Sequence, residues 1–349
     1  MSHPLRIRPD KIGSVCIPFK LGPYLTVSPE GVAGLGVAIV CRVLTARQEY
    51  GYLELPSGRR AVLVPGDKIV GALGARAALR GFCGRVPEKV AVGDELCLLN
   101  QGGVIGTDEG RTVGLGVPIR LEVIGTPMKG DAPMRLADYA IPAVHKLPEH
   151  MPPVLMVAGT CMNAGKTTAA GVIIHRLRGK GLVVHAGKAT GVACIKDLLE
   201  FADNGASQTL SFLDCGLPST CYYGDVPGTT RTLLATLAAG EPDVIVLELG
   251  DGLLGSYGVD DLLACPDIAR SSYGAVLAAN DIIGGWAAAE RLKGFGIKAL
   301  VITGPATDNL AGTAKLEQLG YAAANIFREP ERVCELATPP SVSAQAAAS

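Results

Sequence analysis

Long apolar runs alternate with helix-like segments over the second half of the chain. Runs that are apolar on both faces and separated by helices predict a mainly parallel sheet covered by helices on both sides, an α/β fold. Such a sheet binds its ligands beyond the carboxyl ends of the strands. The runs are 154–158, 182–186, 244–249, 275–279 and 299–303, and the helical segments include 169–177, 228–237, 281–295 and 308–319.

Residues 1–126 follow a different pattern of short apolar or alternating runs. The runs 60–64 and 68–71, for example, are separated by the turn residues Pro65, Gly66 and Asp67. Closely spaced short strands with turns of this kind predict a smaller all-β barrel or sandwich domain.

Composition changes between and after these two patterns. Residues 127–153 contain six prolines and no periodicity, which predicts a linker. Residues 338–349 are rich in Ala, Ser and Pro, as disordered tails are. The 349 residues suffice for two domains, and we expect a β-rich one over 1–126 and an α/β one over 154–330.

The most informative motif follows the run 154–158. A glycine-bounded loop ends in Gly-Lys-Thr and leads into a helix, the context of a phosphate-binding loop. Its backbone N–H groups and the helix N-terminus would bind phosphate oxygens, the lysine would bridge the β- and γ-phosphates, and the first threonine would reach Mg²⁺. The nucleotide-binding residues predicted here are Gly159, Thr160, Asn163, Ala164, Gly165, Lys166, Thr167 and Thr168.

Acidic residues follow two other strands. Glu248 ends the run 244–249, where a phosphate-loop enzyme needs an acid for Mg²⁺. Asp251 contacts Mg²⁺ or substrate, or only builds the turn. Asp197 or Asp203 could complete the Mg²⁺ shell, or either could be a solvated helix residue, and we choose Asp197 as the third metal ligand.

A second lysine, Lys188, leaves the run 182–186 just before the turn Thr190-Gly191. It could clamp the γ-phosphate or an anionic substrate. We therefore expect catalytic roles for Lys166, Lys188 and Asp251.

Net charge, hydropathy and cysteine spacing limit the kinds of binding partner and cofactor that we expect. The net charge of -1 argues against a nucleic-acid surface. The first residues do not resemble a signal peptide, and no apolar run approaches ~20 residues, so we expect a cytoplasmic protein without a membrane partner. The cysteines form no Cys-x-x-Cys pair that would indicate zinc or iron–sulfur. Cys161 lies in the phosphate loop next to a helix N-terminus, where a thiol is either activated or only a loop residue without a chemical role.

Residues 154–325 resemble the dethiobiotin synthetase-like group of phosphate-loop enzymes, within the wider SIMIBI class. The segments that carry the resemblance are the long loop, Lys188-Ala-Thr-Gly191, Glu248-Leu-Gly-Asp-Gly-Leu-Leu254, and Ala279-Asn280-Asp281 with its following helix. The family has Thr-Asp where this loop has Thr160-Cys161. Thr303-Gly-Pro305 stands where its adenine-reading Asn is expected, with Asn309 a distant substitute.

The resemblance implies ATP, Mg²⁺ and phosphorylation of an acid, carbamate or similar oxygen. It makes Thr167 and Glu248 metal ligands, Lys166 and Lys188 phosphate clamps, and Asn280 a cofactor-binding residue, and it suggests a homodimer. A fainter similarity extends to the phosphate-loop family that contains D-glutamate N-acetyltransferases. Residues 1–126 have no counterpart in dethiobiotin synthetase itself.

Our leading hypothesis is an ATP- and Mg²⁺-dependent kinase-like or ligase-like enzyme acting on a small anionic molecule. One alternative is a nucleotide-dependent switch or maturation chaperone, which would hydrolyse nucleotide with a partner protein. Another is an acyltransferase that holds a phosphate-containing donor such as coenzyme A in the loop and needs no Glu248–Mg²⁺ pairing.

Overall fold

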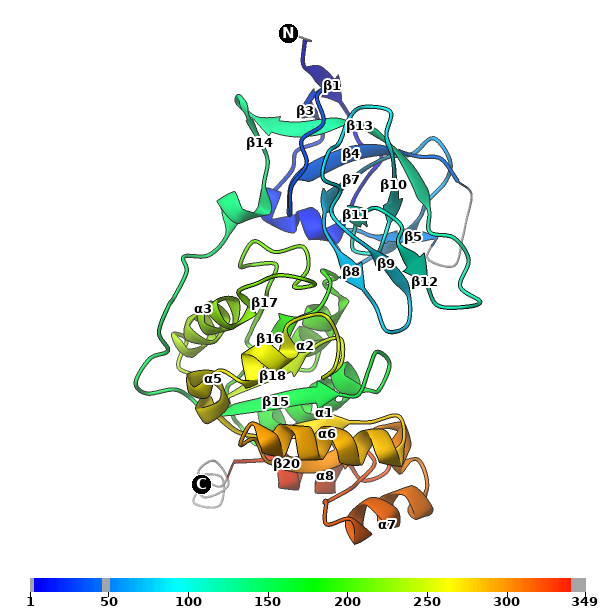
Figure 1. The fold of residues 1–349 in the computed structure, drawn as a ribbon. Helices are drawn as coiled ribbons and strands as arrows, with labels where there is room; N and C mark the ends of the chain where they lie inside the picture. Colours follow the sequence, from blue (N-terminus) through cyan, green and yellow to red (C-terminus); the bar gives the residue numbers. More distant parts are fainter. Residues whose placement is uncertain (1–2, 46–50, 340–349) are drawn as a thin grey trace. The chain divides into compact units, whose positions relative to one another are not determined.

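The structure, a computed structural model, describes residues 3–45 and 51–339 (Figure 1). The chain forms two compact units, which we describe separately. The first comprises Met1–Pro142, Val192–Lys196 and Phe212–Tyr223, and the second Ala143–Gly191, Asp197–Ser211 and Gly224–Ser349. Of the tail predicted to be disordered, 338–349, all but the first two residues lie outside the described ranges. Within those ranges, no helix is long and apolar enough to cross a membrane.

The first unit is β-rich, as its short alternating runs predict. Its elements are β1 (Leu5–Ile7), β2 (Lys11–Ile12), η1 (Ser14–Phe19), β3 (Leu25–Ser28), β4 (Ala38–Val43), β5 (Tyr52–Glu54), β6 (Arg60–Val62), β7 (Lys68–Leu73), β8 (Arg76–Ala77), β9 (Phe82–Gly84), β10 (Glu95–Leu98), β11 (Val104–Gly106), β12 (Gly110–Arg111), β13 (Arg120–Lys129), β14 (Ala132–Pro133) and η2 (Leu136–Tyr139).

Five of these strands pair in a closed circuit. β13 pairs with β10, β10 with β11, β11 with β7, β7 with β4, and β4 again with β13. Among these five pairings, the one between β7 and β11 is parallel and the other four are antiparallel. Alternate side chains of β4 fall into two buried clusters, with Ile39 and Cys41 in one and Ala38 and Val40 in the other. The closed circuit is the part of the predicted barrel or sandwich that the structure shows.

The range predicted as a linker, 127–153, contains regular structure at its start. β13 runs to Lys129, and β14 and η2 follow it. Leu136 in η2 is buried in the first unit's core, and its N–H donates to the carbonyl of Gly36. Proline-rich composition therefore did not distinguish the start of this range, which is folded and packed, from a free linker.

The second unit is an α/β fold. Its elements, of which α2 begins one residue inside the first unit, are β15 (Val154–Gly159), α1 (Lys166–Gly179), β16 (Val184–Thr190), α2 (Lys196–Asp203), β17 (Gln208–Ser211), α3 (Val226–Ala238), β18 (Val244–Leu249), α4 (Val259–Leu263), α5 (Pro266–Ser271), β19 (Ser272–Ala278), α6 (Ile282–Gly294), β20 (Ala299–Thr303), η3 (Pro305–Thr307), α7 (Leu310–Gln318) and α8 (Pro330–Ala337).

The six strands of the second unit form one parallel sheet in the order β17-β16-β18-β15-β19-β20. Five of them match the predicted apolar runs. The sixth, β17, is an edge strand of four residues, three of them only half-buried, so no apolar run marks it. β15 lies between β18 and β19, and the loop that follows it therefore opens beside the carboxyl ends of both.

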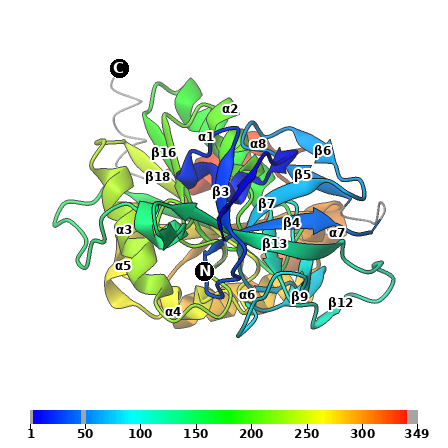
Figure 2. The same cartoon turned by 90° about the horizontal axis from the view of Figure 1, so that it is seen from above.

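Helices cover both faces of this sheet (Figure 2). α1 and α8 share one buried cluster with alternate residues of the strands, Leu155 and Val157 of β15 among them. α3 and α6 pack on the other face, where Gly187 and Gly285 leave room for them. α8 lies beyond the predicted end of the domain at 330, yet its Val333 is fully buried in the same core.

Candidate functional site

The loop between β15 and α1 has the strand–loop–helix geometry of a phosphate-binding loop (Figure 1). Gly165 precedes the helix with a φ of 99°, in the left-handed region that glycine adopts at no steric cost. A Cβ on Gly159 would lie 2.8 Å from Cγ of Lys166 and 3.1 Å from the carbonyl oxygen of Ala278. Gly165 is thus favoured by its backbone conformation, and Gly159 by the close packing of the Lys166 side chain against it.

Lys166, the first residue of α1, is only 7% exposed. Its ammonium group donates to the carbonyl oxygens of Cys161 (2.8 Å) and Asp251 (2.5 Å). Burial lowers the pKa of this lysine. The amine is therefore held over the loop by two carbonyls, which phosphate oxygens could replace.

Four polar side chains meet at the start of α1. Lys188 of β16 forms an ion pair with Asp197 of α2, and its Nζ lies 3.8 Å from Oε1 of Glu248 in β18. The Thr167 hydroxyl lies 3.5 Å from Oδ1 of Asp197. The structure thus brings together Thr167, Lys188, Asp197 and Glu248 from separate parts of the sequence, whereas Asp203 is exposed at the far end of α2.

One carboxylate oxygen of Glu248 is buried without a hydrogen bond to any residue that the structure describes. The residue is 2% exposed, and its Oε2 has no hydrogen-bond partner within the part of the chain that the structure describes. Burial raises the pKa of its carboxyl group, and the nearby Lys188 acts in the opposite direction. A buried carboxylate oxygen without a donor is costly unless a cation or a proton accompanies it.

These oxygens suit Mg²⁺. It prefers carboxylate and hydroxyl oxygens, and at phosphate sites it uses one or two carboxylates besides the phosphates and water. Thr167, Asp197 and Glu248 supply such oxygens from three different elements. Across residues 3–45 and 51–339, no group of three or more His, Cys, Asp or Glu side chains could enclose a metal by itself. The oxygens of Thr167, Asp197 and Glu248 fit a hydrated Mg²⁺ whose remaining ligands come from outside the protein.

The segment after β18 packs directly on the phosphate loop. The N–H of Leu253 donates to the carbonyl of Gly159 at 3.0 Å. A Cβ on Gly252 would lie 2.6 Å from the carbonyl oxygen of Thr160, so only glycine fits this approach. Asp251 contacts the loop through its backbone carbonyl, which accepts from Lys166. The contact between the two loops could not be predicted from either segment alone.

Asn280, which follows β19, also contacts the loop. Its N–H donates to the Thr160 hydroxyl at 3.3 Å, and its side-chain amide donates to the Cys161 sulfur at 2.7 Å. Gly304, after β20, lies against the same loop, because a Cβ there would be 2.4 Å from the Ala164 carbonyl oxygen. Asn309, the distant substitute for a base-reading residue, instead caps α7 by accepting the N–H of Gly312 at 3.0 Å.

Of the remaining predicted loop residues, Asn163 is exposed and has a φ of 59°, and Thr168 is half-buried in the first turn of α1. Asn163 thus adopts a left-handed conformation that asparagine tolerates better than most residues.

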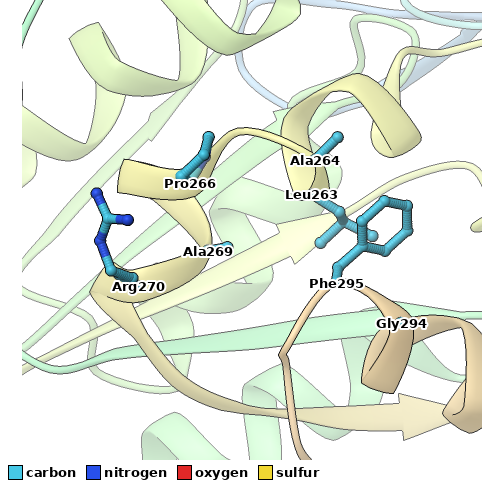
Figure 3. Close-up of a pocket in the computed structure, with 7 residues that line it drawn as sticks. All are labelled: Leu263, Ala264, Pro266, Ala269, Arg270, Gly294 and Phe295. Carbon is cyan, nitrogen blue, oxygen red and sulfur yellow. The ribbon is translucent and has the colours of Figure 1, made fainter.

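A separate depression of about 390 Å³ lies elsewhere in the second unit (Figure 3). Its lining comes from the α4–α5 region and the end of α6, and it is apolar apart from Arg270. No residue of the phosphate loop lines it, and neither does any of Thr167, Lys188, Asp197 and Glu248, which we call the acidic cluster. It is thus distinct from the predicted site.

No family model and no curated protein matches this chain. Among solved structures it is similar to the signal recognition particle receptor FtsY from Elizabethkingia anophelis in complex with GDP (19% identity, 52% of this chain and 58% of that one, TM-score 0.36). It is also similar to chloroplast FtsY from Physcomitrella patens (16%, 54% and 62%, 0.37). A third match is the 54 kDa signal recognition particle protein from Aeropyrum pernix in complex with GDP (18%, 57% and 50%, 0.38).

The chain therefore spans less than two thirds of each of these structures. At such identities and scores the likeness does not extend to function, and the resemblance to dethiobiotin synthetases stays a prediction.

Proposed function

We propose that the second unit binds ATP with Mg²⁺ and transfers the γ-phosphoryl group to an oxygen of a small anionic molecule. The acceptor would be a carboxylate, carbamate or hydroxyl group, so the enzyme would be kinase-like or ligase-like. The observation that carries this proposal is the partnerless buried oxygen of Glu248, which lies in the acidic cluster at the end of a phosphate-binding loop.

Thr167, Glu248 and Asp197 would hold Mg²⁺ in this proposal. When bound, the ion neutralises phosphate charge and supplies a partner for Oε2 of Glu248, the oxygen that Lys188 does not reach. Asp197 also accepts from Lys188, so this carboxylate would fix the lysine while it faces the metal.

The two lysines would act on the phosphates. Lys166 would exchange the carbonyls of Cys161 and Asp251 for β- and γ-phosphate oxygens, with little movement of its buried stem. Lys188 would stabilise the charge of the transferred group or of the acceptor. Catalysis would then come from positioning and from charges fixed before the reaction. Asn280 would keep the loop in shape through Thr160 and Cys161.

The variant Glu248→Gln tests this function, because it keeps the shape of the side chain and removes its charge. We expect nucleotide-dependent phosphoryl transfer or hydrolysis to fall by about 10²-fold or more, the size of effect that removing one preorganised electrostatic group has. Glu335→Gln, an exposed change on α8, serves as the control and should keep wild-type activity. The assay measures ADP release with a set of small carboxylic acids, and GTP is run beside ATP.

Other outcomes would favour the alternatives. Acetyl-CoA binding without Mg²⁺, unchanged by Glu248→Gln and without ATP binding, would replace the proposal with an acyltransferase. Hydrolysis that requires a partner protein and no small acceptor would indicate the switch or maturation chaperone.

A further inference from the structure

The segment that connects β16, which holds Lys188, to α2, which holds Asp197, belongs to the first unit. Val192–Lys196 begins two residues after β16 ends at Thr190, and it immediately precedes Asp197. Within the first unit, Asn100 donates through its amide to the carbonyl of Ala193 at 2.8 Å. A Cβ on Gly102 would lie 2.0 Å from that same carbonyl oxygen, so the backbones are in close contact. The first unit therefore fixes the backbone two to four residues before Asp197.

Glu54, the last residue of β5, is the main anchor of this segment. It is 2% exposed, and its carboxylate accepts from the N–H groups of Ile195 (2.7 Å) and Lys196 (3.3 Å). It also accepts from the Cys194 thiol at 2.9 Å and from the Ser14 hydroxyl. Four donors from two segments thus converge on one buried carboxylate.

These contacts cap a helix. The first N–H groups of an α-helix have no partner within the helix, and the dipole at that end favours a negative charge. α2 begins at Lys196, and Glu54 accepts the N–H of this residue and that of Ile195 just before it. The cap comes from a residue about 140 positions earlier in the chain, whereas most helices are capped by a neighbouring residue.

We infer that Glu54 is a positioning residue for the acidic cluster: by capping α2 it holds Asp197 against Lys188 and Thr167. The inference rests on the proposed function only for the role of Asp197 toward Mg²⁺. Asp197 is the second residue of α2, so the place of its side chain depends on where the helix begins and on the direction in which it leaves.

Glu54→Gln is the sharpest variant. The amide is isosteric with the carboxylate, but one of its two positions becomes an NH₂ group that faces donors only. Glu54→Asp is the second variant, since it keeps the charge but is one methylene too short to reach all four donors. Glu95→Gln is the matched control, because Glu95 is in the same unit but is exposed and pairs with Arg120.

The first measurement needs no nucleotide. Lys188 is acetylated by limiting acetic anhydride in the intact protein and quantified by mass spectrometry, because the contact with Asp197 shields the half-buried amine from the reagent. We expect the rate to rise by about fivefold in Glu54→Gln, the effect of losing a helix cap. Asp197→Asn should raise it as well, and the double variant should react no faster than Asp197→Asn.

Hydrogen exchange on the same samples should accelerate in residues 195–203 and stay unchanged in α3. Unchanged Lys188 labelling in Glu54→Gln and Glu54→Asp, or additive effects in the double variant, would overturn the inference whether or not the protein binds a nucleotide.

A second measurement separates this inference from the proposed function. In a wild type that binds ATP, Glu54→Gln should raise the Mg²⁺ concentration for half-maximal binding by about fivefold, with little change in ATP affinity without Mg²⁺. An unchanged Mg²⁺ requirement, despite faster labelling, would overturn the role toward the metal. A wild type that binds no nucleotide, but whose Lys188 labelling follows the expected pattern, would refute the proposed function and leave the positioning of Asp197 by Glu54 supported.

Discussion

Gly252→Ala should weaken nucleotide binding by separating the two loops of the site. In the present geometry the new methyl carbon would lie 2.6 Å from the carbonyl oxygen of Thr160 and 2.9 Å from Cα of Cys161. Both are backbone atoms, so no side chain can rotate away. Gly252 does not have a positive φ, and the substitution therefore tests this contact and not backbone strain.

The size of the effect follows from these distances. Two carbon atoms attract best at about 3.5 Å or more, so the methyl group and Cys161 must separate by about 0.6 Å. Overpacking of this kind costs about 1–3 kcal/mol of folding stability. If about 1.4 kcal/mol of this strain is relieved by displacing the phosphate loop, binding of Mg²⁺–ATP weakens by about tenfold, which is the effect we expect.

The assay is calorimetric titration with Mg²⁺–ATP, together with urea unfolding to show that the variant is folded. Gly179→Ala is the control, since its Cβ meets nothing within 4 Å and alanine is the better helix former. A folded Gly252→Ala protein that binds Mg²⁺–ATP as tightly as the wild type would show that this contact does not shape the site.

Two further predictions concern caps and charges of the second unit. Asn309→Ala should cost about 1 kcal/mol in urea unfolding through loss of the α7 cap, with ATP and GTP affinities unchanged, whereas altered base selectivity would restore a base-reading role. Hydrogen bonds from Arg231 hold the pKa of Asp267 well below its usual range. Because the folded-state pKa is the lower one, this stabilisation is present above about pH 4 and is lost as the pH falls further. Asp267→Asn should therefore flatten the acid side of the stability–pH curve, and a curve parallel to the wild type's would contradict this.

Much of the site could be predicted because its residues are adjacent to strong local patterns. Glu248 is the next-to-last residue of the otherwise apolar strand β18, and Lys188 lies opposite it in the adjacent strand β16. In a parallel sheet the carboxyl ends meet at one edge, so the positions of such residues follow from the strands themselves. The loop that ends at Lys166 could also be predicted, because the strand before it and the helix after it directly adjoin it in the sequence.

Other features depend on contacts between distant residues. The choice between Asp197 and Asp203 turns on where α2 begins, and that is set by Glu54 and by a segment that packs in the first unit. The close approach of Gly252 to Thr160 has no local signal other than a glycine. Likewise, a half-buried edge strand such as β17 carries too little hydrophobic pattern to be predicted.

The most direct test of the account is a calorimetric titration of the wild-type protein and Lys166→Met with ATP, with and without Mg²⁺. The exposed Lys180→Met, at the other end of the same helix, controls for the loss of one positive charge. We predict binding that Mg²⁺ strengthens, that Lys180→Met retains and that Lys166→Met loses by about 10²-fold or more. Binding that is independent of both Mg²⁺ and Lys166, or no ATP binding by the wild type, would contradict a phosphate-binding role for this loop.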